Sequence, residues 1–158
     1  MGFGFPAAIG AQFANPDKKV WAIVGDVGFQ MTQAELATAR VHKLPGKCLI
    51  INNHYLGMIR QWQEMFYENR LSGSDLEGNP DFVKLAQAHS IKALRIRRPG
   101  DVDRILSEAH EYDEGPCVVV AEVVKEDNVF PMIPAGAAVS EMIIEKPKHR
   151  MDKPEGST

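Results

Sequence analysis

The feature that most constrains the fold is an alternation of short apolar runs with segments of helical periodicity. The runs have the length and β-branched content of buried strands, and they cover residues 18–25, 47–53, 92–98 and 116–124. Helical spacing is found in residues 6–14, 32–40, 57–67, 82–90 and 102–112. Strands alternating with helices at this spacing predict an α/β fold, a mainly parallel sheet with helices on both faces.

Local signals predict where two of these helices begin. Thr32 is followed three residues later by Glu35, which is the spacing of a capping box, and Asp81 is placed to cap the helix that follows it. We expect the helix beginning near Thr32 to direct free N–H groups and a positive dipole end at an anion.

Composition excludes several classes of function. The chain has 158 residues and a formal net charge of −3, with no basic run, so neither nucleic acid nor a membrane surface is an expected partner. No apolar run approaches the roughly 18 residues of a membrane helix. Cys48 and Cys117 stand alone in apolar runs, which predicts buried free thiols and a reducing compartment.

The first residues of the chain resemble a segment from within a domain. Gly2 and Gly4 precede Pro6 and a short helix, as in a loop that follows a strand. We therefore expect a domain of a longer polypeptide, covering residues 1–145. Residues 146–158 are polar and are expected to form a disordered tail.

Polar residues follow two of the predicted strands, Gly25-Asp26 after the first and Asn52-Asn53 after the second. Ligands of parallel sheets bind outside the carboxyl ends of the strands. If the two ends meet, a carboxylate and an amide oxygen provide the ligands that Mg²⁺ prefers, and phosphate can complete its coordination. The alternative for Asp26 alone is a turn residue or helix cap, and Asn52 is interpreted as a structural hydrogen-bonding residue.

The spacing Gly25-Asp26-x-Gly28, about 25 residues and Asn52-Asn53 resembles the thiamine diphosphate motif. The stretches "MGFGFPAAIGA", "FQMTQAELATA", "INNHYLGMIRQWQEMFY", "PDFVKLAQAH" and "PMIPAGAAVSEMI" extend the resemblance, over residues 1–145, to the C-terminal, diphosphate-binding domain of the acetolactate (acetohydroxyacid) synthase catalytic subunit. The resemblance implies the thiamine diphosphate-binding fold.

The resemblance also implies a set of site residues. Mg²⁺ would be held by the side chains of Asp26 and Asn53 and by the backbone carbonyl of Tyr55. Trp62 would shape the pocket for the second 2-oxoacid. Position 27 departs from the family, because Val27 is bulkier than the usual Gly, Ala or Ser. The residues that would border the cofactor are Met1, Gly25, Asp26, Val27, Gly28, Met31, Asn53, Tyr55, Gly57 and Met58.

As an activity, the resemblance implies decarboxylation of pyruvate and its condensation with pyruvate or 2-oxobutyrate, in branched-chain amino acid biosynthesis in the cytoplasm. The catalytic glutamate and FAD would belong to domains outside this chain, so no catalytic residue is assigned here and the chain alone is expected to be inactive. Expected partners are the pyrimidine-binding and FAD domains, further copies in a homo-oligomer, and a small regulatory subunit.

Several alternatives stay open at this point. The chain could belong to another thiamine-dependent decarboxylase or carboligase, such as glyoxylate carboligase. A nucleotide-binding regulatory module is disfavoured, because neither GxGxxG after a strand nor GxxxxGK[ST] is present. The isolated chain could also bind no ligand measurably. The segment 131–143 either packs on the sheet or caps the site, and Arg95, Arg97 and Arg98 are expected to form a solvated edge.

Overall fold

The computed structural model describes residues 1–146, and its centre is a parallel sheet with the strand order β1-β2-β4-β3. The strands are β1 (Trp21–Gly25), β2 (Lys47–Asn52), β3 (Lys92–Ile96) and β4 (Cys117–Glu122). β4 lies between two neighbours, and its first five residues are buried. Burial on both faces explains why this segment is almost continuously apolar.

The helices complete the alternation that the sequence predicts. The predicted segments 6–14, 57–67, 82–90 and 102–112 are all helical, with ends that differ by a few residues from the expected ones. The helices are α1 (Gly4–Ala14), α2 (Asp26–Gln30), η1 (Gln33–Glu35), α3 (Leu36–Val41), α4 (Gly57–Phe66), α5 (Phe82–Ala88), η2 (Pro99–Asp101), α6 (Val102–Glu111) and η3 (Val139–Glu141).

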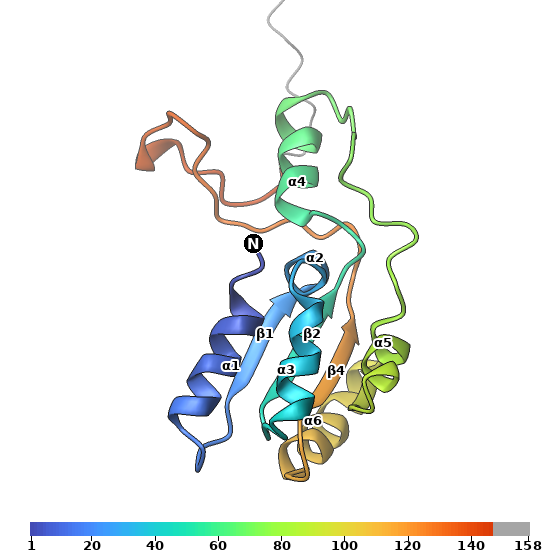
Figure 1. Cartoon of the computed structure of the whole chain (residues 1–158). Coiled ribbons are helices and arrows are strands. Elements are labelled where there is room, and N and C mark those ends of the chain that lie inside the picture. Colours follow the sequence, from blue (N-terminus) through green and yellow to red (C-terminus); the bar gives the residue numbers. More distant parts are fainter. Residues whose placement is uncertain (147–158) are drawn as a thin grey trace, which may run out of the picture.

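Helices cover both faces of the sheet, as expected, but unequally (Figure 1). On one face, α1, α2, α3 and α5 enclose a core centred on Phe29, which is fully buried between the rings of Phe5 and Phe82. On the other face, α6 packs alone through Ile105 and Ala109. Cys48 and Cys117 are buried free thiols, as predicted, and they belong to different clusters on opposite faces.

The predicted capping box at Thr32 is wrong. Thr32 Oγ1 is buried without a hydrogen-bond partner among the described residues, while the Glu35 carboxylate accepts a hydrogen bond from Thr38 Oγ1 at 2.8 Å. The chain forms the short helix α2 directly after β1 and then turns, so α3 begins only at Leu36. The helix end next to the strand tip is therefore that of α2. Asp81, in contrast, caps α5 as predicted, by accepting from the N–H groups of Val83 and Lys84.

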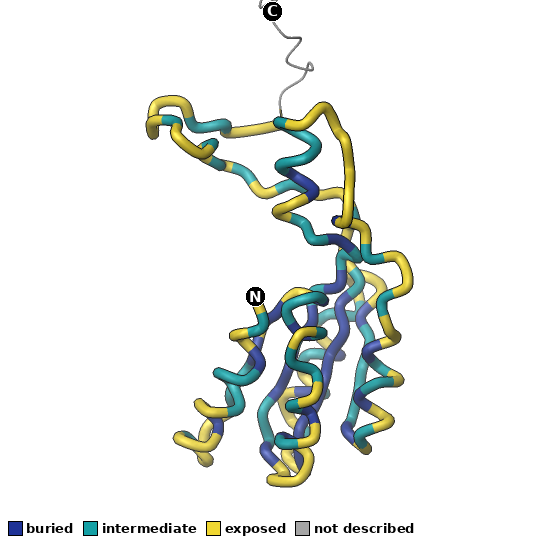
Figure 2. Tube along the Cα trace, turned by 45° about the horizontal axis from the view of Figure 1, so that its top comes forward, coloured by how far each residue is buried: buried dark blue, intermediate teal, exposed yellow. Residues whose placement is uncertain are grey.

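α4 stands beyond the carboxyl ends of the strands, together with the segment that follows β4 (Figures 1 and 2). We call α4 and residues 124–146 the upper lobe. Buried Gln61 and Arg60 hold this segment to α4, through the backbone of Val129 and the side chain of Asn128. The segment 131–143 folds back on itself, with Met132 paired to Ile143. Met132 contacts Gln61 of α4, and the rest of the segment extends away from the sheet (Figure 1). The predicted disordered tail, apart from Lys146, lies outside the described residues.

The basic end of β3 is only partly a solvated edge. Arg97 and Arg98 are exposed. Arg95 is instead partly enclosed and pairs with both Asp81 and Glu122, because these acids come to the same sheet edge from α5 and β4.

Candidate functional site

The ends of β1 and β2 meet, as the sequence predicts. Gly25 is paired with Ile51 in the sheet, so the residues that follow the two strands emerge side by side. The Asp26 carboxylate reaches the second strand end directly, because its Oδ2 accepts a hydrogen bond from the backbone N–H of His54 at 2.9 Å. Asn53 is the residue immediately before His54. The expected carboxylate and amide therefore lie at one edge of the sheet.

Asp26 is enclosed, with only 3% of its surface exposed. Its Oδ1 accepts from the N–H of Val27 at 2.8 Å, and the amide of Asn79 lies 3.4 Å from its Oδ2. Burial raises the pKa of the Asp26 carboxyl above its ordinary value, since the charged form loses its hydration. No lysine or arginine of the described chain forms an ion pair with it. A buried carboxylate without a basic partner is suited to a bound cation.

The loop after β2 is held in a defined conformation. His54 adopts a left-handed backbone with φ of 56°, and Asn53 Oδ1 accepts from the N–H of Tyr55 at 3.3 Å. Tyr55 pairs with Asp75 in an isolated antiparallel bridge. The N–H of Leu56 donates to the carbonyl of Ser74 at 2.8 Å, so the long loop 67–81 supports this turn.

Glycines leave room around the strand ends. A Cβ on Gly57 would lie 3.2 Å from Asn53 Nδ2, which is tighter than an ordinary contact, so glycine lets α4 begin close to the Asn53 side chain. A Cβ on Gly25 or Gly28 would meet open space. Val27, the departure from the family pattern, is half-buried and belongs to neither core cluster.

The expected cofactor-facing methionines are exposed. Met1, Met31 and Met58 have exposed fractions of 76%, 58% and 62%. A Cβ on Gly2 would lie 3.4 Å from Met31 Cβ, so the start of the chain lies next to the turn after α2. Figure 1 shows this end below the upper lobe and beside α2.

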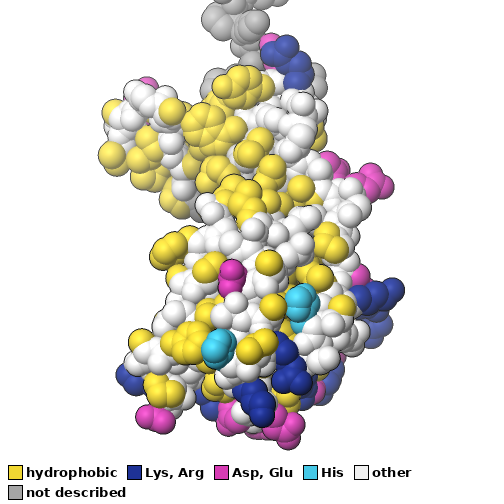
Figure 3. Space-filling view, in the orientation of Figure 1, with side chains coloured by type: hydrophobic (Ala, Val, Ile, Leu, Met, Phe, Trp, Pro, Cys, Tyr) yellow, Lys and Arg dark blue, Asp and Glu magenta, His cyan; other side chains and the backbone are white. Residues whose placement is uncertain are grey.

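Trp62 lines a groove on α4 rather than the core. The groove has a volume of about 710 Å³, and Trp62 shares it with Met58 and Tyr67. Figure 3 shows hydrophobic side chains gathered over this part of the molecule, above a hollow between the upper lobe and the sheet. The role of Trp62 as a wall of the pocket for the second 2-oxoacid stays a prediction.

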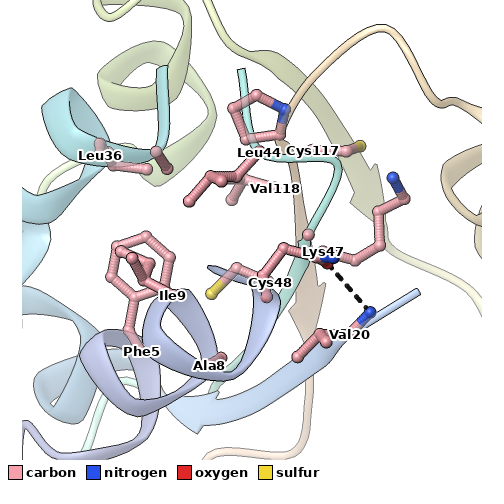
Figure 4. A pocket seen from close by; sticks show the side chains of 14 residues that line it. Phe5, Ala8, Ile9, Val20, Leu36, Leu44, Lys47, Cys48, Cys117 and Val118 are labelled. Atoms are coloured by element: carbon pink, nitrogen blue, oxygen red, sulfur yellow. Dashed lines mark hydrogen bonds between the residues drawn. The ribbon is translucent and has the colours of Figure 1, made fainter. Parts of the chain in front are cut away.

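A second cavity is too small for a substrate. It lies between α1 and β2 and has about 20 Å³, room for about one water molecule (Figure 4). Its walls are mostly apolar, including Phe5, Ile9 and Val118. The charged residue there, Lys47, is buried, and its Nζ donates to the carbonyls of Pro45 and Tyr112. This cavity is a packing defect of the core.

The sequence does not predict three of the contacts at the site. Asn79 reaches Asp26 from a loop, although the stretch Gly78-Asn79-Pro80 reads only as a turn. The N–H of His54 is a backbone group, to which side-chain motifs give no clue. Glu122 ends β4 and accepts from the amide of Asn52 at 2.8 Å, which confirms the structural role expected of Asn52. The sequence signal for this contact is the position of Glu122, an acid at the end of the apolar strand β4.

Residues 1–121 match the protein family described as "Thiamine pyrophosphate enzyme, C-terminal TPP binding domain". The chain belongs to this family. Thiamine pyrophosphate is another name for thiamine diphosphate, so the resemblance seen in the sequence is confirmed, as is the fold class. The match also links the strand-end geometry to a known cofactor class.

Relatives give a more specific likeness. The chain is 47% identical over 146 residues to the acetolactate synthase large subunit of Lactococcus lactis, and 44% identical over 150 residues to that of Porphyra purpurea. It is 45% identical over 146 residues to the acetolactate synthase of Mycobacterium avium. These alignments cover 90% to 94% of the chain but 24% to 25% of the relatives. The chain thus spans about a quarter of the length of the curated relatives that it matches.

The donor set fits a magnesium-bound diphosphate. Asp26 supplies a buried carboxylate, Asn53 supplies an amide oxygen, and the glycines beside them leave space for a ligand. No group of three or more His, Cys, Asp or Glu residues that could hold a metal ion is found in residues 1–146. Within the same residues, no helix is long and apolar enough to cross a membrane.

Proposed function

We propose that this chain is the diphosphate- and Mg²⁺-binding part of an acetolactate synthase. The observation that carries the proposal is Asp26, a buried carboxylate that forms no ion pair with a lysine or arginine of residues 1–146 and is held at the point where two parallel strands end. Membership of the thiamine pyrophosphate enzyme family supports thiamine diphosphate as the cofactor. The similarity to acetolactate synthases on both sides of the strand-end motif supports acetolactate synthesis as the reaction.

In this proposal, Mg²⁺ is held by Asp26, the Asn53 side chain and the backbone carbonyl of Tyr55. Gly25, Val27, Gly28 and Gly57 would border the diphosphate, and open space lies beside Gly25 and Gly28. The methionines Met1, Met31 and Met58 border the rest of the cofactor.

When bound, thiamine diphosphate supplies the electron sink for decarboxylation of a 2-oxoacid. The residues of this chain bind and orient the cofactor, and Trp62 forms part of the wall for the second 2-oxoacid. The first substrate is pyruvate, and the second is pyruvate or 2-oxobutyrate. The reaction belongs to branched-chain amino acid biosynthesis. The proposed setting is the cytoplasm.

The rest of the enzyme is proposed to come from outside this chain. The catalytic glutamate lies on a pyrimidine-binding domain, FAD on a further domain, and the assembly is a homo-oligomer that can include a small regulatory subunit. The chain alone is therefore expected to bind cofactor without turning over substrate. Product analysis on the complete enzyme separates acetolactate formation from the reactions of other thiamine-dependent carboligases.

Isothermal titration of the purified chain with thiamine diphosphate tests the binding role. We expect saturable binding that requires Mg²⁺ and is lost in Asp26→Ala, because the metal then loses its charged ligand. Asp113→Ala is a matched control, since this exposed acid pairs with Lys19 between the start of β1 and the start of β4, at the opposite edge of the sheet. Binding that is indifferent to Mg²⁺, or equal in the two variants, would contradict the proposal.

A further inference from the structure

The end of β4 carries an acid that is joined to both neighbouring strands. Glu122 lies opposite Asn52 in the sheet, and its Oε2 accepts from Asn52 Nδ2 at 2.8 Å. The same oxygen lies 3.3 Å from Nε2 of His54. On the other side, Glu122 Oε1 lies 3.4 Å from the Arg95 guanidinium. One side chain thus connects three strand ends.

The group held by Glu122 is the turn that contacts Asp26. His54 has φ of 56°, a left-handed conformation that is costly for a residue with a Cβ. In this conformation its N–H points at Asp26 Oδ2, at 2.9 Å. On the other side, Nε2 of the His54 ring lies 3.3 Å from Glu122 Oε2 and 3.0 Å from Asn52 Nδ2, so it either donates to the carboxylate or accepts from the amide.

Glu122 is itself held in place by residues outside the loop that contains His54. Arg95, which faces Glu122, also pairs with Asp81, and Asp81 caps α5. Glu122 is therefore kept in place by a strand and by a helix end. Side-chain contacts that fix a neighbouring ligand in this way commonly tune metal affinity, by about 10- to 100-fold.

We propose that Glu122 is a positioning residue for the magnesium site. It holds Asn52 and His54 so that the backbone N–H of His54 fixes the orientation of the Asp26 carboxylate. Glu122 does not touch the metal or the cofactor. This inference rests on the proposed function, because positioning Asp26 matters only if Asp26 binds Mg²⁺.

The first test measures the positioned hydrogen bond itself, without any ligand. Amide hydrogen exchange is followed by NMR in the ¹⁵N-labelled chain for His54, with Val119 in the fully buried part of β4 as the reference for global unfolding. In Glu122→Ala we expect exchange of the His54 amide to accelerate about tenfold more than that of Val119. Glu122→Gln retains an oxygen that can accept from Asn52, so it is expected to keep most of the protection.

The second test measures binding of Mg²⁺ and thiamine diphosphate by isothermal titration. Glu122→Ala is expected to weaken binding about tenfold, and Glu122→Gln less. Glu108→Ala is the matched control, because Glu108 also pairs with a basic residue of β3, Lys92, but from α6. The control is expected to leave both the His54 amide and the binding unchanged.

The outcomes distinguish a failure of the positioning role of Glu122 from a failure of the proposed function. If exchange of His54 in Glu122→Ala changes only in step with Val119, or if Glu122→Ala and Glu108→Ala weaken binding equally, Glu122 has only a general structural role and the inference is overturned. If the wild-type chain shows no Mg²⁺-dependent binding of thiamine diphosphate, the proposed function fails, and this inference fails with it, whatever the His54 amide does.

Discussion

Within the upper lobe, the buried side chain of Gln61 is one of the contacts that hold residues 124–146 to α4, beside those of Arg60 and Glu64 with Asn128. The Gln61 amide makes both backbone hydrogen bonds of Val129, with Oε1 accepting from the N–H at 2.9 Å and Nε2 donating to the carbonyl at 2.9 Å. Gln61 is 2% exposed, whereas Val129 is 67% exposed, so the helix supplies the rigid partner. Gln61→Ala removes both hydrogen bonds at once.

The expected magnitude follows from these two contacts. A hydrogen bond contributes about 1 kcal/mol net, so the loss of two weakens the attachment by about 2 kcal/mol, or about 30-fold in the opening equilibrium. Hydrogen exchange with mass spectrometry, on peptides that cover residues 126–146, is expected to show this acceleration. The peptides of β4 should be unaffected, because the segment is not part of the sheet.

Gln63→Ala is the matched control on the same helix. Gln63 donates to the carbonyl of Ser72 and accepts from Ser74 Oγ, so its loss should loosen the loop 68–76 and leave residues 126–146 unchanged. If Gln61→Ala leaves exchange of residues 126–146 within about twofold of wild type, below the effect of even one hydrogen bond, the reasoning about this attachment is wrong.

Other contacts lead to further predictions. Asn79→Ala should weaken Mg²⁺-dependent cofactor binding a few-fold in isothermal titration, while Asn69→Ala, in the same loop, should not; equal effects would remove Asn79 from the site. The Lys125 ammonium lowers the pKa of the Asp75 carboxyl, so this contact stabilises the fold at neutral pH and is lost as the pH falls through that lowered pKa. In an NMR titration of the Asp75 carboxyl, Lys125→Ala should move the pKa upward, and no change would refute the pairing. Burial raises the pKa of Cys117 to about 11, so Cys48 and Cys117 should resist a thiol reagent at pH 8 until urea unfolds the chain; rapid labelling of the native chain would contradict their burial.

The sequence predicts the parts of this molecule that depend on periodicity and on strand ends. Burial of β4 on both faces requires a continuous apolar run, and the run is visible in the sequence. The meeting of Asp26 with the end of β2 follows from the direction of parallel strands, since their carboxyl ends share one edge.

Contacts that depend on side-chain competition could not be predicted in this way. Thr32 and Glu35 have the spacing of a capping box, but the chain enters α2 directly after β1, and Glu35 bonds to Thr38 instead. Arg95 looks solvated in the sequence, and only the sheet order brings it beside Glu122. Asn79 lies in an aperiodic loop, whose path is set by tertiary contacts such as the bridge between Tyr55 and Asp75.

The most direct test of the account is the position of the metal. A crystal structure of the chain with Mn²⁺, in place of Mg²⁺, and thiamine diphosphate locates the ion by its anomalous scattering. We predict one ion bound to the Asp26 carboxylate, Asn53 Oδ1 and the Tyr55 carbonyl, with the diphosphate completing its coordination. An ion elsewhere on the chain, or cofactor bound away from Asp26, would contradict the central claim.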